Sequence, residues 1–299
     1  MRVFHCDSYP VPLPPGHRFP MPKYRLIRER LLGDGTLSEA DFTPSQPVEL
    51  DALLLVHDRA YVDAVVSGGL TEAEVRRLGF PWSEWLVSRS RASVAGTLAA
   101  ARDALSNGIS GNLAGGTHHA FADHGEGYCV FNDHAVAFRV LQLEGRVDRA
   151  VIVDLDVHQG NGTAAIFAAD ESVFTFSMHG ARNYPFRKQR SSLDVDLGDG
   201  CEDAEYLALL SRHLPAALDA ARADILFYQG GVDPLAGDAL GRLRLTHAGV
   251  RARDRMVLTA ARDRGIPVVL TLGGGYARPV EASVEAHCGT YREARAVFG

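Results

Sequence analysis

Short hydrophobic runs alternate along the chain with longer segments in which apolar residues recur at helical spacing. Such runs, bounded by polar or turn-forming residues, are typical of strands that are buried on both faces of a parallel sheet. The strand-like runs are Arg2–Cys6, Ala150–Leu155, Ser172–Met178, Asp224–Gln229 and Ile266–Leu272. The helix-like segments are Tyr24–Leu32, Arg59–Val66, Ser88–Ser106, Asp133–Leu143, Asp203–Arg222 and Thr246–Asp263.

This alternation predicts an α/β fold, because parallel strands are joined by right-handed helical crossovers. We expect three layers, with a central, mainly parallel sheet flanked by helices. The chain shows no internal repeat and no low-complexity linker, so the expectation is one domain over residues 1–299. The proline-rich stretch Pro10–Pro22 is interpreted as a long loop, either an ordinary surface loop or one that passes over a site.

Two acids and a histidine, Asp154, Asp156 and His158, stand at the end of the run Ala150–Leu155. Open α/β sheets place ligand sites at the carboxyl ends of their strands. Asp156 and His158 are two residues apart, so in extended chain they point the same way and could bind one divalent metal. A single acid here would favour a capped strand end, but Asp-x-Asp-x-His before glycine-rich chain favours a site.

Adjacent histidines, His118 and His119, stand in the glycine-rich segment Ala114–Ala120. A lone histidine is more often a satisfied core or surface residue. A pair beside glycines favours acid–base or metal chemistry, because glycine lets the backbone approach a ligand closely. The pair is therefore a second candidate for the chemistry of this chain.

A further aspartate, Asp233, follows the run Asp224–Gln229. Alone it could be a turn aspartate that accepts hydrogen bonds from its own backbone. Together with Asp156 and His158 it would complete three protein ligands. Such a set leaves an open position for water and substrate, as in catalytic zinc sites.

Three glycines, Gly273 to Gly275, precede Tyr276 after the run Ile266–Leu272. This arrangement indicates a phenol that is held near a ligand. A phosphate-binding loop is disfavoured, because no Lys-Ser/Thr pair follows the glycines. A purely structural turn is the remaining alternative.

Composition narrows the class of protein. The net charge of −6, from 31 basic and 37 acidic residues, argues against a nucleic-acid partner. Four scattered cysteines without a Cys-x-x-Cys pair favour a reducing compartment. The first residues lack the apolar core of a signal peptide, and no apolar run reaches membrane-spanning length. We therefore expect a cytoplasmic protein with no membrane partner.

Taken together, the motifs resemble the zinc-dependent histone deacetylase superfamily, which includes acetylpolyamine and acetoin-utilisation deacetylases. The resemblance covers nearly the whole chain and is greatest to class IV and to bacterial histone deacetylase-like amidohydrolases. It implies the arginase/deacetylase α/β fold. The matching pieces are His118-His119, Gly127–Asp133, Asp154–Gly162, Gly231–Asp233 with Ala236–Asp238, and Gly273–Tyr276.

The resemblance also implies a role for each of these residues. Asp156, His158 and Asp233 would hold one catalytic Zn²⁺, for which Fe²⁺ or Co²⁺ could substitute. His119 would be the main general base, His118 an electrostatic partner, and Tyr276 the hydroxyl that stabilises the oxyanion. Asp154 would orient His118, and Asn161 would orient His119. Many relatives carry aspartate in place of Asn161, so His119 should be less basic in this chain.

The substrate tunnel implied by the resemblance involves Gly127, Tyr128, Tyr184 and Gly274. Plain core packing is the alternative for Tyr128. The entrance loops Pro10–Pro22 and Leu78–Trp85 would control access. A structural K⁺ is implied beside the zinc, and its oxygen ligands would come from Asp154, Asp156, His158, Ser177 and Met178.

Arginase-like dinuclear manganese hydrolases share the implied fold and are a rival interpretation. They need carboxylates to bridge a second metal, but Gly160 and Leu235 stand at the two positions concerned. The favoured function is a zinc amidohydrolase acting on acylated lysine in a peptide or protein. Small acetylated amines such as acetylpolyamines are the alternative substrates. A non-catalytic acyl-binding module is disfavoured, because both histidines and Tyr276 are present.

Overall fold

One parallel sheet organises the molecule. The computed structural model describes residues 1–299, and all eight strands of its sheet pair in parallel in the order β2-β1-β3-β8-β7-β4-β5-β6. This result confirms the predicted α/β fold with a parallel sheet. The strands are β1 (Arg2–His5), β2 (Phe42–Pro44), β3 (Ile109–Asn112), β4 (Ala150–Asp154), β5 (Val173–Gly180), β6 (Leu193–Leu197), β7 (Ile225–Gln229) and β8 (Val268–Thr271).

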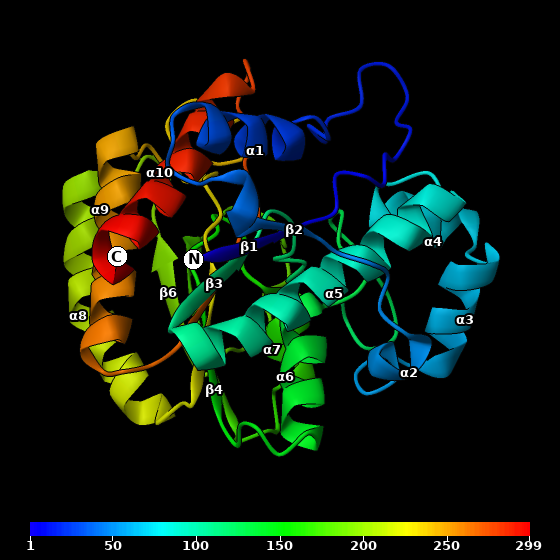
Figure 1. Cartoon of the computed structure of the whole chain (residues 1–299). Helices are drawn as coiled ribbons and strands as arrows, with labels where there is room; N and C mark the ends of the chain where they lie inside the picture. Colours follow the sequence, from blue (N-terminus) through cyan, green and yellow to red (C-terminus); the bar gives the residue numbers. More distant parts are fainter.

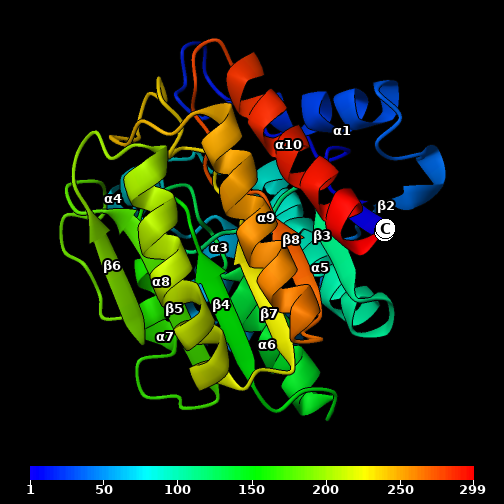
Figure 2. The same cartoon turned by 90° about the vertical axis from the view of Figure 1, so that its left-hand side faces the viewer.

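Helices cover both faces of this sheet, which gives the three expected layers. Figure 2 shows α8, α9 and α10 in front of the sheet and α5, α6 and α7 behind it. The helices are α1 (Lys23–Gly33), α2 (Leu50–Leu53), α3 (Arg59–Ser67), α4 (Glu72–Leu78), α5 (Glu84–Asn107), α6 (Asp133–Leu143), α7 (Asn161–Ile166), α8 (Asp203–Ala221), α9 (His247–Asp263) and α10 (Glu281–Phe298). None of them combines the length and apolar character that a membrane-spanning helix needs.

The central strands are apolar along their length because both of their faces are buried. In β4, Val151 and Val153 pack in the cluster that includes Leu210 and Leu214 of α8. Ile152 points to the opposite face, where it joins a cluster with Phe138 of α6. Successive strand residues face opposite sides, so one short run fills two cores.

The five predicted strands are all present, but the sequence pattern missed β2, β3 and β6 as well as α2, α4, α7 and α10. The strand β3 reads Ile-Ser-Gly-Asn and is fully buried although half of its residues are polar. Helix α10 likewise buries polar residues, among them His287 and Thr290. Strand β3 lacks the hydrophobic periodicity on which the prediction depended. In α10 the apolar residues Val284, Cys288 and Tyr291 do recur at helical spacing, and the prediction overlooked them among the polar residues.

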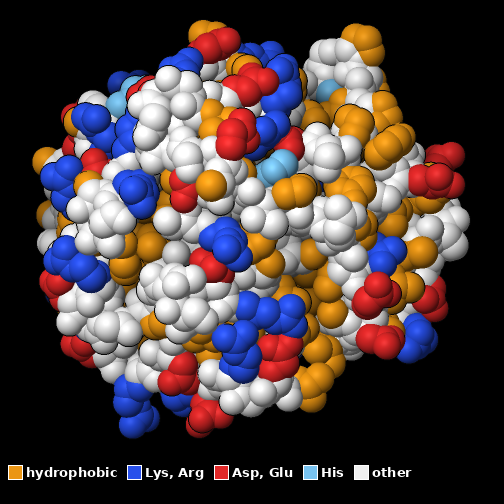
Figure 3. Space-filling model, in the orientation of Figure 1, with side chains coloured by type: hydrophobic (Ala, Val, Ile, Leu, Met, Phe, Trp, Pro, Cys, Tyr) orange, Lys and Arg blue, Asp and Glu red, His pale blue; other side chains and the backbone are white.

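The segment Pro10–Pro22 forms a long loop between β1 and α1 (Figure 1). Figure 3 shows this loop projecting from one edge of the molecule, with hydrophobic side chains gathered along and below it. Its inner end is ordered by aromatic contacts, since the ring of Phe19 lies 4.8 Å from that of Phe80. Arg18 of this loop lines the cavity described below, so the loop forms part of its wall.

Candidate active site

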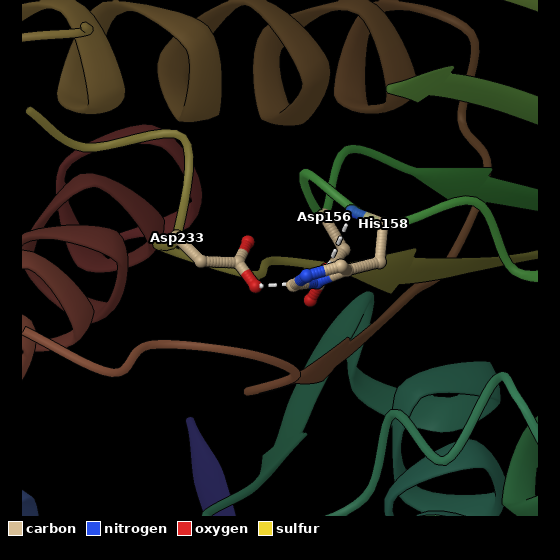
Figure 4. Close-up of side chains that lie close together, drawn as sticks. All are labelled: Asp156, His158 and Asp233. Carbon is tan, nitrogen blue, oxygen red and sulfur yellow. Dashed lines mark hydrogen bonds and ion pairs between the residues drawn. The ribbon is translucent and has the colours of Figure 1, made fainter. Parts of the chain in front are cut away.

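Three buried side chains converge at the carboxyl edge of the sheet. Asp156 and His158 follow β4, and Asp233 follows the neighbouring strand β7. One ligand atom from each residue lies within 4.8 Å of the other two. The Nδ1 atom of His158 is 3.0 Å from Asp156 Oδ1 and 3.0 Å from Asp233 Oδ2. Figure 4 shows Asp233 approaching from one loop while Asp156 and His158 approach from the other.

These three residues have the donor chemistry of a divalent metal site. His158 Nδ1 carries at most one proton, which its hydrogen bond directs to Asp156 Oδ1, and the buried Asp233 Oδ2 is left without a hydrogen bond. Burial and the neighbouring Asp156 carboxylate raise the pKa of Asp233 to about 7. A cation between the two carboxylates would remove this repulsion, and nitrogen with carboxylate oxygen suits zinc. The residues therefore fit the implied metal.

The loops that carry the three residues are fixed by backbone contacts. The amide N–H groups of Val157 and Gly274 donate to Asp233 Oδ1 at 2.9 Å and to Asp156 Oδ2 at 2.7 Å. A Cβ atom at Gly274 would lie 1.9 Å from Asp233 Oδ2, so only glycine fits there. Gly274, predicted to contact substrate, thus lies directly against the candidate metal ligands.

A buried arginine connects the loop after β4 with the loop after β7. The Arg253 side chain is fully buried and donates to the carbonyl oxygens of Leu155 at 3.1 Å and Gly231 at 2.6 Å. Its charge is balanced by Asp254, whose Oδ1 is 2.7 Å from Arg253 Nη2. The paired carboxylate allows a charged side chain to remain buried while it holds both loops.

The adjacent histidines reach the same place from the loop after β3. That loop is anchored by Asp133, which accepts hydrogen bonds from the amides of Gly116 at 3.0 Å and Thr117 at 2.8 Å. The rings of His118 and His119 lie 4.1 Å apart, and that of His119 lies 6.0 Å from His158. The structure therefore places the two adjacent histidines, which were predicted to act in acid–base chemistry, beside the candidate metal site.

His118 and His119 differ in their electrostatic environment. His118 Nδ1 donates to Asp154 Oδ2 at 2.7 Å. Burial alone would lower the pKa of His118, but the Asp154 and Asp156 carboxylates raise it to about 8. His119 Nδ1 donates instead to the neutral amide oxygen of Asn161 at 2.7 Å. Burial and the charges of His118 and His158 hold the pKa of His119 well below its usual value.

A carboxylate stands behind Asn161. Asn161 Nδ2 donates to Glu126 Oε1 at 2.6 Å, which fixes the amide with its oxygen toward His119. Glu126 also lies near Tyr184, and burial together with the Glu126 carboxylate raises the pKa of the Tyr184 phenol. His119 is therefore oriented through an amide whose own orientation is set by an acid.

Tyr276 completes the site from the glycine loop after β8. Its backbone N–H donates to Asp238 Oδ2 at 2.6 Å, and its ring lies 6.4 Å from that of His158. Burial and the charges of Asp156 and Asp233 hold the pKa of the Tyr276 phenol well above its usual value, so the hydroxyl stays protonated and can donate.

Lys23 supports this loop from the buried side. Its Nζ atom lies 3.0 Å from the carbonyl oxygen of Gly273 and 5.4 Å from the centre of the Tyr276 ring. Burial lowers the pKa of Lys23 to about 8. The contact places a cationic group under the residue that presents the phenol.

A cavity of about 710 Å³ opens onto these groups, and His119, His158, Gly127, Tyr128, Tyr184 and Tyr276 all line it. The Tyr184 ring stands edge-on to His119 at 5.0 Å. Tyr128 faces Phe19 at 5.2 Å and Tyr276 at 6.2 Å. Gly127 has a positive φ, and a Cβ there would lie 2.7 Å from His119 Cδ2. Three of the four predicted tunnel residues, Gly127, Tyr128 and Tyr184, thus line one cavity with His119, whereas Gly274 is not among its lining residues.

The residues predicted to bind K⁺ lie beside the candidate metal site. Asp154 pairs in register with Ser177 across β4 and β5, and Met178 follows in the same buried strand. The Ser177 hydroxyl is 2.9 Å from His179 Nδ1. The strand ends thus bring the predicted oxygen donors together, while the ion itself stays a prediction.

The chain is similar over most of its length to known proteins. Residues 17–291 match the model of the histone deacetylase domain. The chain is 46% identical to an uncharacterized protein of Picosynechococcus over 99% of this chain and 98% of that one. It is 33% identical to histone deacetylase 2 of Arabidopsis thaliana over 90% of this chain and 73% of the relative. The fold matches the crystal structure of an HDAC homologue from Aquifex aeolicus, with a TM-score of 0.86, 23% identity, and coverage of 99% and 84%.

The chain therefore belongs to the histone deacetylase family, as its motifs predicted. Family membership indicates a hydrolase of deacetylase type. The structural match at this low identity confirms the arginase/deacetylase fold.

Sequence reasoning missed several residues that support the site. Glu126, Arg253 and Lys23 each contact a site residue or its loop, yet none stands in a pattern that predicts such a role. Asp133 was recognised only as part of a matching segment and the start of a helix. Its contacts with the histidine loop depend on the approach of α6 to that loop, which spacing along the chain does not reveal.

Proposed function

We propose that the chain hydrolyses the amide bond of N-acylated lysine in a peptide or protein, with one Zn²⁺ held by Asp156, His158 and Asp233. One observation supports the proposal: these three side chains, the His118–His119 pair and Tyr276 lie close together, and His119, His158 and Tyr276 of this group line one cavity. When bound, zinc would supply a Lewis acid that polarises the acyl carbonyl and lowers the pKa of water.

His119 is the general base in this proposal. Its lowered pKa keeps the ring neutral at physiological pH. Because Nδ1 donates to Asn161, the other ring nitrogen carries the free lone pair that accepts the proton of the attacking water. The same nitrogen then returns the proton to the leaving amine, so the proton count closes. His118, paired with Asp154, supplies positive charge beside the developing oxyanion.

Tyr276 donates its hydroxyl to that oxyanion, since its pKa keeps the phenol protonated. Tyr128 and Tyr184 form the walls that hold the acyl-lysine stem, and the Gly127 carbonyl accepts from the substrate amide. The Asp154, Asp156, His158, Ser177 and Met178 oxygens would hold a structural K⁺. All of these roles belong to a single catalytic domain.

The proposal is tested with zinc-loaded protein and an acetyl-lysine peptide. Tyr276→Phe removes one oxyanion donor and is expected to lower kcat about a hundred- to thousand-fold. His119→Ala should lower kcat comparably. Matched controls are Tyr9→Phe, at a partly buried residue, and His247→Ala, at an exposed residue, both outside the cavity. Undiminished turnover in both site variants, or full activity after rigorous metal removal, contradicts the proposed mechanism.

A further inference from the structure

The mouth of the cavity is lined by arginine. Its 18 lining residues contain no aspartate or glutamate, but they include five exposed arginines from four separate segments, Arg18, Arg76, Arg77, Arg182 and Arg242. The chain as a whole carries a net charge of −6. The entrance is therefore positively charged although the whole chain carries a net negative charge.

Ordinary surface ion pairs neutralise this rim only in part. Arg76 pairs with Glu72 at 3.3 Å, and Glu72 is 93% exposed. Arg242 and Arg182 share a single carboxylate, Asp199, at 3.2 Å and 3.9 Å. Exposed pairs of this kind contribute little and are screened by salt. Two carboxylates thus face five guanidinium groups.

Two of the five arginines have no acidic partner at all. Neither Arg18, in the loop after β1, nor Arg77, in α4, has a carboxylate oxygen within 4.0 Å. Their guanidinium groups also form no side-chain hydrogen bond within the protein. Five donors in a planar fork suit carboxylates, which they can bind in a bidentate manner.

We propose that the site selects acyl-lysine that is embedded in an acidic stretch of polypeptide, with aspartate or glutamate flanking the acylated residue. The inference rests on the proposed function and names its substrate class. Arginines from four segments around one mouth can meet residues on more than one side of the acyl-lysine, which favours a peptide over a small molecule. The exposed ring of Phe186, 87% exposed on the same rim, offers a peptide an apolar contact.

The positive charge of the five arginines also disfavours cationic substrates. An acetylated polyamine keeps free ammonium groups, and a lysine- and arginine-rich tail keeps many more. Like charges facing one another across a binding site lower affinity and slow the encounter. The arginine rim therefore argues against acetylpolyamines, the alternative substrates expected from the sequence.

Peptide binding tests this preference independently of turnover. Three labelled peptides of equal length, each with one acetyl-lysine and with acidic, neutral or basic flanks, are titrated by fluorescence anisotropy with the zinc-loaded Tyr276→Phe variant, whose slow turnover leaves the peptides intact. The acidic peptide should bind roughly ten-fold more tightly than the neutral one at low salt, and the basic peptide more weakly still. Raising the salt concentration should shrink these differences by screening.

Variants that remove arginine charges test whether the entrance arginines cause the preference for acidic peptides. The double variant Arg18→Gln/Arg77→Gln removes the two unpaired guanidinium groups and should abolish most of the difference between acidic and neutral peptides. The matched control is Arg146→Gln/Arg212→Gln, at two exposed arginines outside the cavity. The control should keep the full difference.

The outcomes separate this inference from the function on which it rests. Equal affinity for the three peptides, or a preference that survives Arg18→Gln/Arg77→Gln, overturns the inference even if all are deacetylated. Acetylspermidine or free acetyl-lysine binding as tightly as the acidic peptide also overturns it. An acidic preference in binding without turnover of any peptide upholds the arginine rim and contradicts the proposed hydrolysis.

Discussion

The carboxylate of Glu126 accepts a hydrogen bond of 2.6 Å from the side-chain amide of Asn161. Asn161 in turn accepts one of 2.7 Å from His119 Nδ1. An amide is nearly symmetric in shape and can turn over, which would present a donor to His119. Glu126 prevents this, and so selects the tautomer in which the proposed base has its free nitrogen toward the cavity.

Removing this support should impair catalysis while leaving binding intact. Glu126→Ala is expected to lower kcat roughly ten-fold with little change in KM, because the amide of Asn161 loses its fixed orientation. Glu126→Gln should retain most activity, since its amide oxygen can still accept from Asn161. Steady-state kinetics of both variants provide the check, and a loss that appears only in KM would point to a substrate contact instead.

Replacing the neutral amide by an acid should shift the pH profile. Asn161→Asp, combined with Glu126→Gln to supply a donor in place of a second carboxylate, puts a negative charge beside His119. That charge raises the pKa of His119 from its lowered value. The base must be neutral to accept a proton, so the acidic limb of kcat/KM should move to higher pH by about one unit or more. An unchanged limb would exclude His119 as the titrating base.

Gly274 should be essential for metal binding rather than for folding. A Cβ there would lie 1.9 Å from Asp233 Oδ2 and 2.8 Å from Asp156 Oδ2, so Gly274→Ala must displace the candidate ligands. Zinc affinity, measured by competition with a chelating dye, should fall roughly ten- to hundred-fold. Gly33→Ala is the control, because a methyl group there meets nothing within 4 Å. Equal affinity in both variants would contradict the assigned ligand set.

Stability should depend on pH through His57. This buried ring donates from Nδ1 to the Phe121 carbonyl oxygen at 2.9 Å and accepts at Nε2 from the Asn132 amide at 3.0 Å. Burial lowers its pKa from 6.5 to about 4. The unfolded chain therefore binds the proton first, and stability falls as the pH drops from 6.5 to 4, by about 3 kcal/mol in total.

Urea unfolding at pH 7 and pH 5 measures this effect. His57→Gln carries no titrating ring, so its stability should change less between the two pH values than that of the unaltered protein. His247→Gln, at an exposed position on α9, should behave like the unaltered protein. The same pH dependence in all three proteins would assign the effect to other groups.

The sequence predicted the centre of the site because its residues follow recognisable strands. The runs ending near Asp154 and Gln229 are apolar, and the carboxyl ends of parallel strands share one edge, so Asp156, His158 and Asp233 had to lie near one another. Glu126 could not be found in this way, since it stands in a loop without periodicity and meets Asn161 through folding alone.

The cluster of arginines at the cavity entrance could not be predicted from sequence patterns either. Arg18, Arg77, Arg182 and Arg242 are far apart along the chain, and nothing in the sequence around each one marks them as neighbours in space. Only the packing of their four segments around the cavity turns scattered charges into a field of one sign. The buried polar strand β3 shows the same limit, because its Ser110 hydroxyl and Asn112 Nδ2 donate to partners distant in sequence.

The candidate ligands stand on two loops that are remote along the chain, after β4 and after β7. An unfolded chain cannot offer the three together, so a metal bound by Asp156, His158 and Asp233 acts as a cross-link that forms only in the native state. Free metal concentration then becomes a determinant of how long the protein survives. Above the dissociation constant, each ten-fold rise in free metal should add about 1.4 kcal/mol to the free energy of unfolding. Metal supply would thus regulate the abundance of the protein as well as its activity.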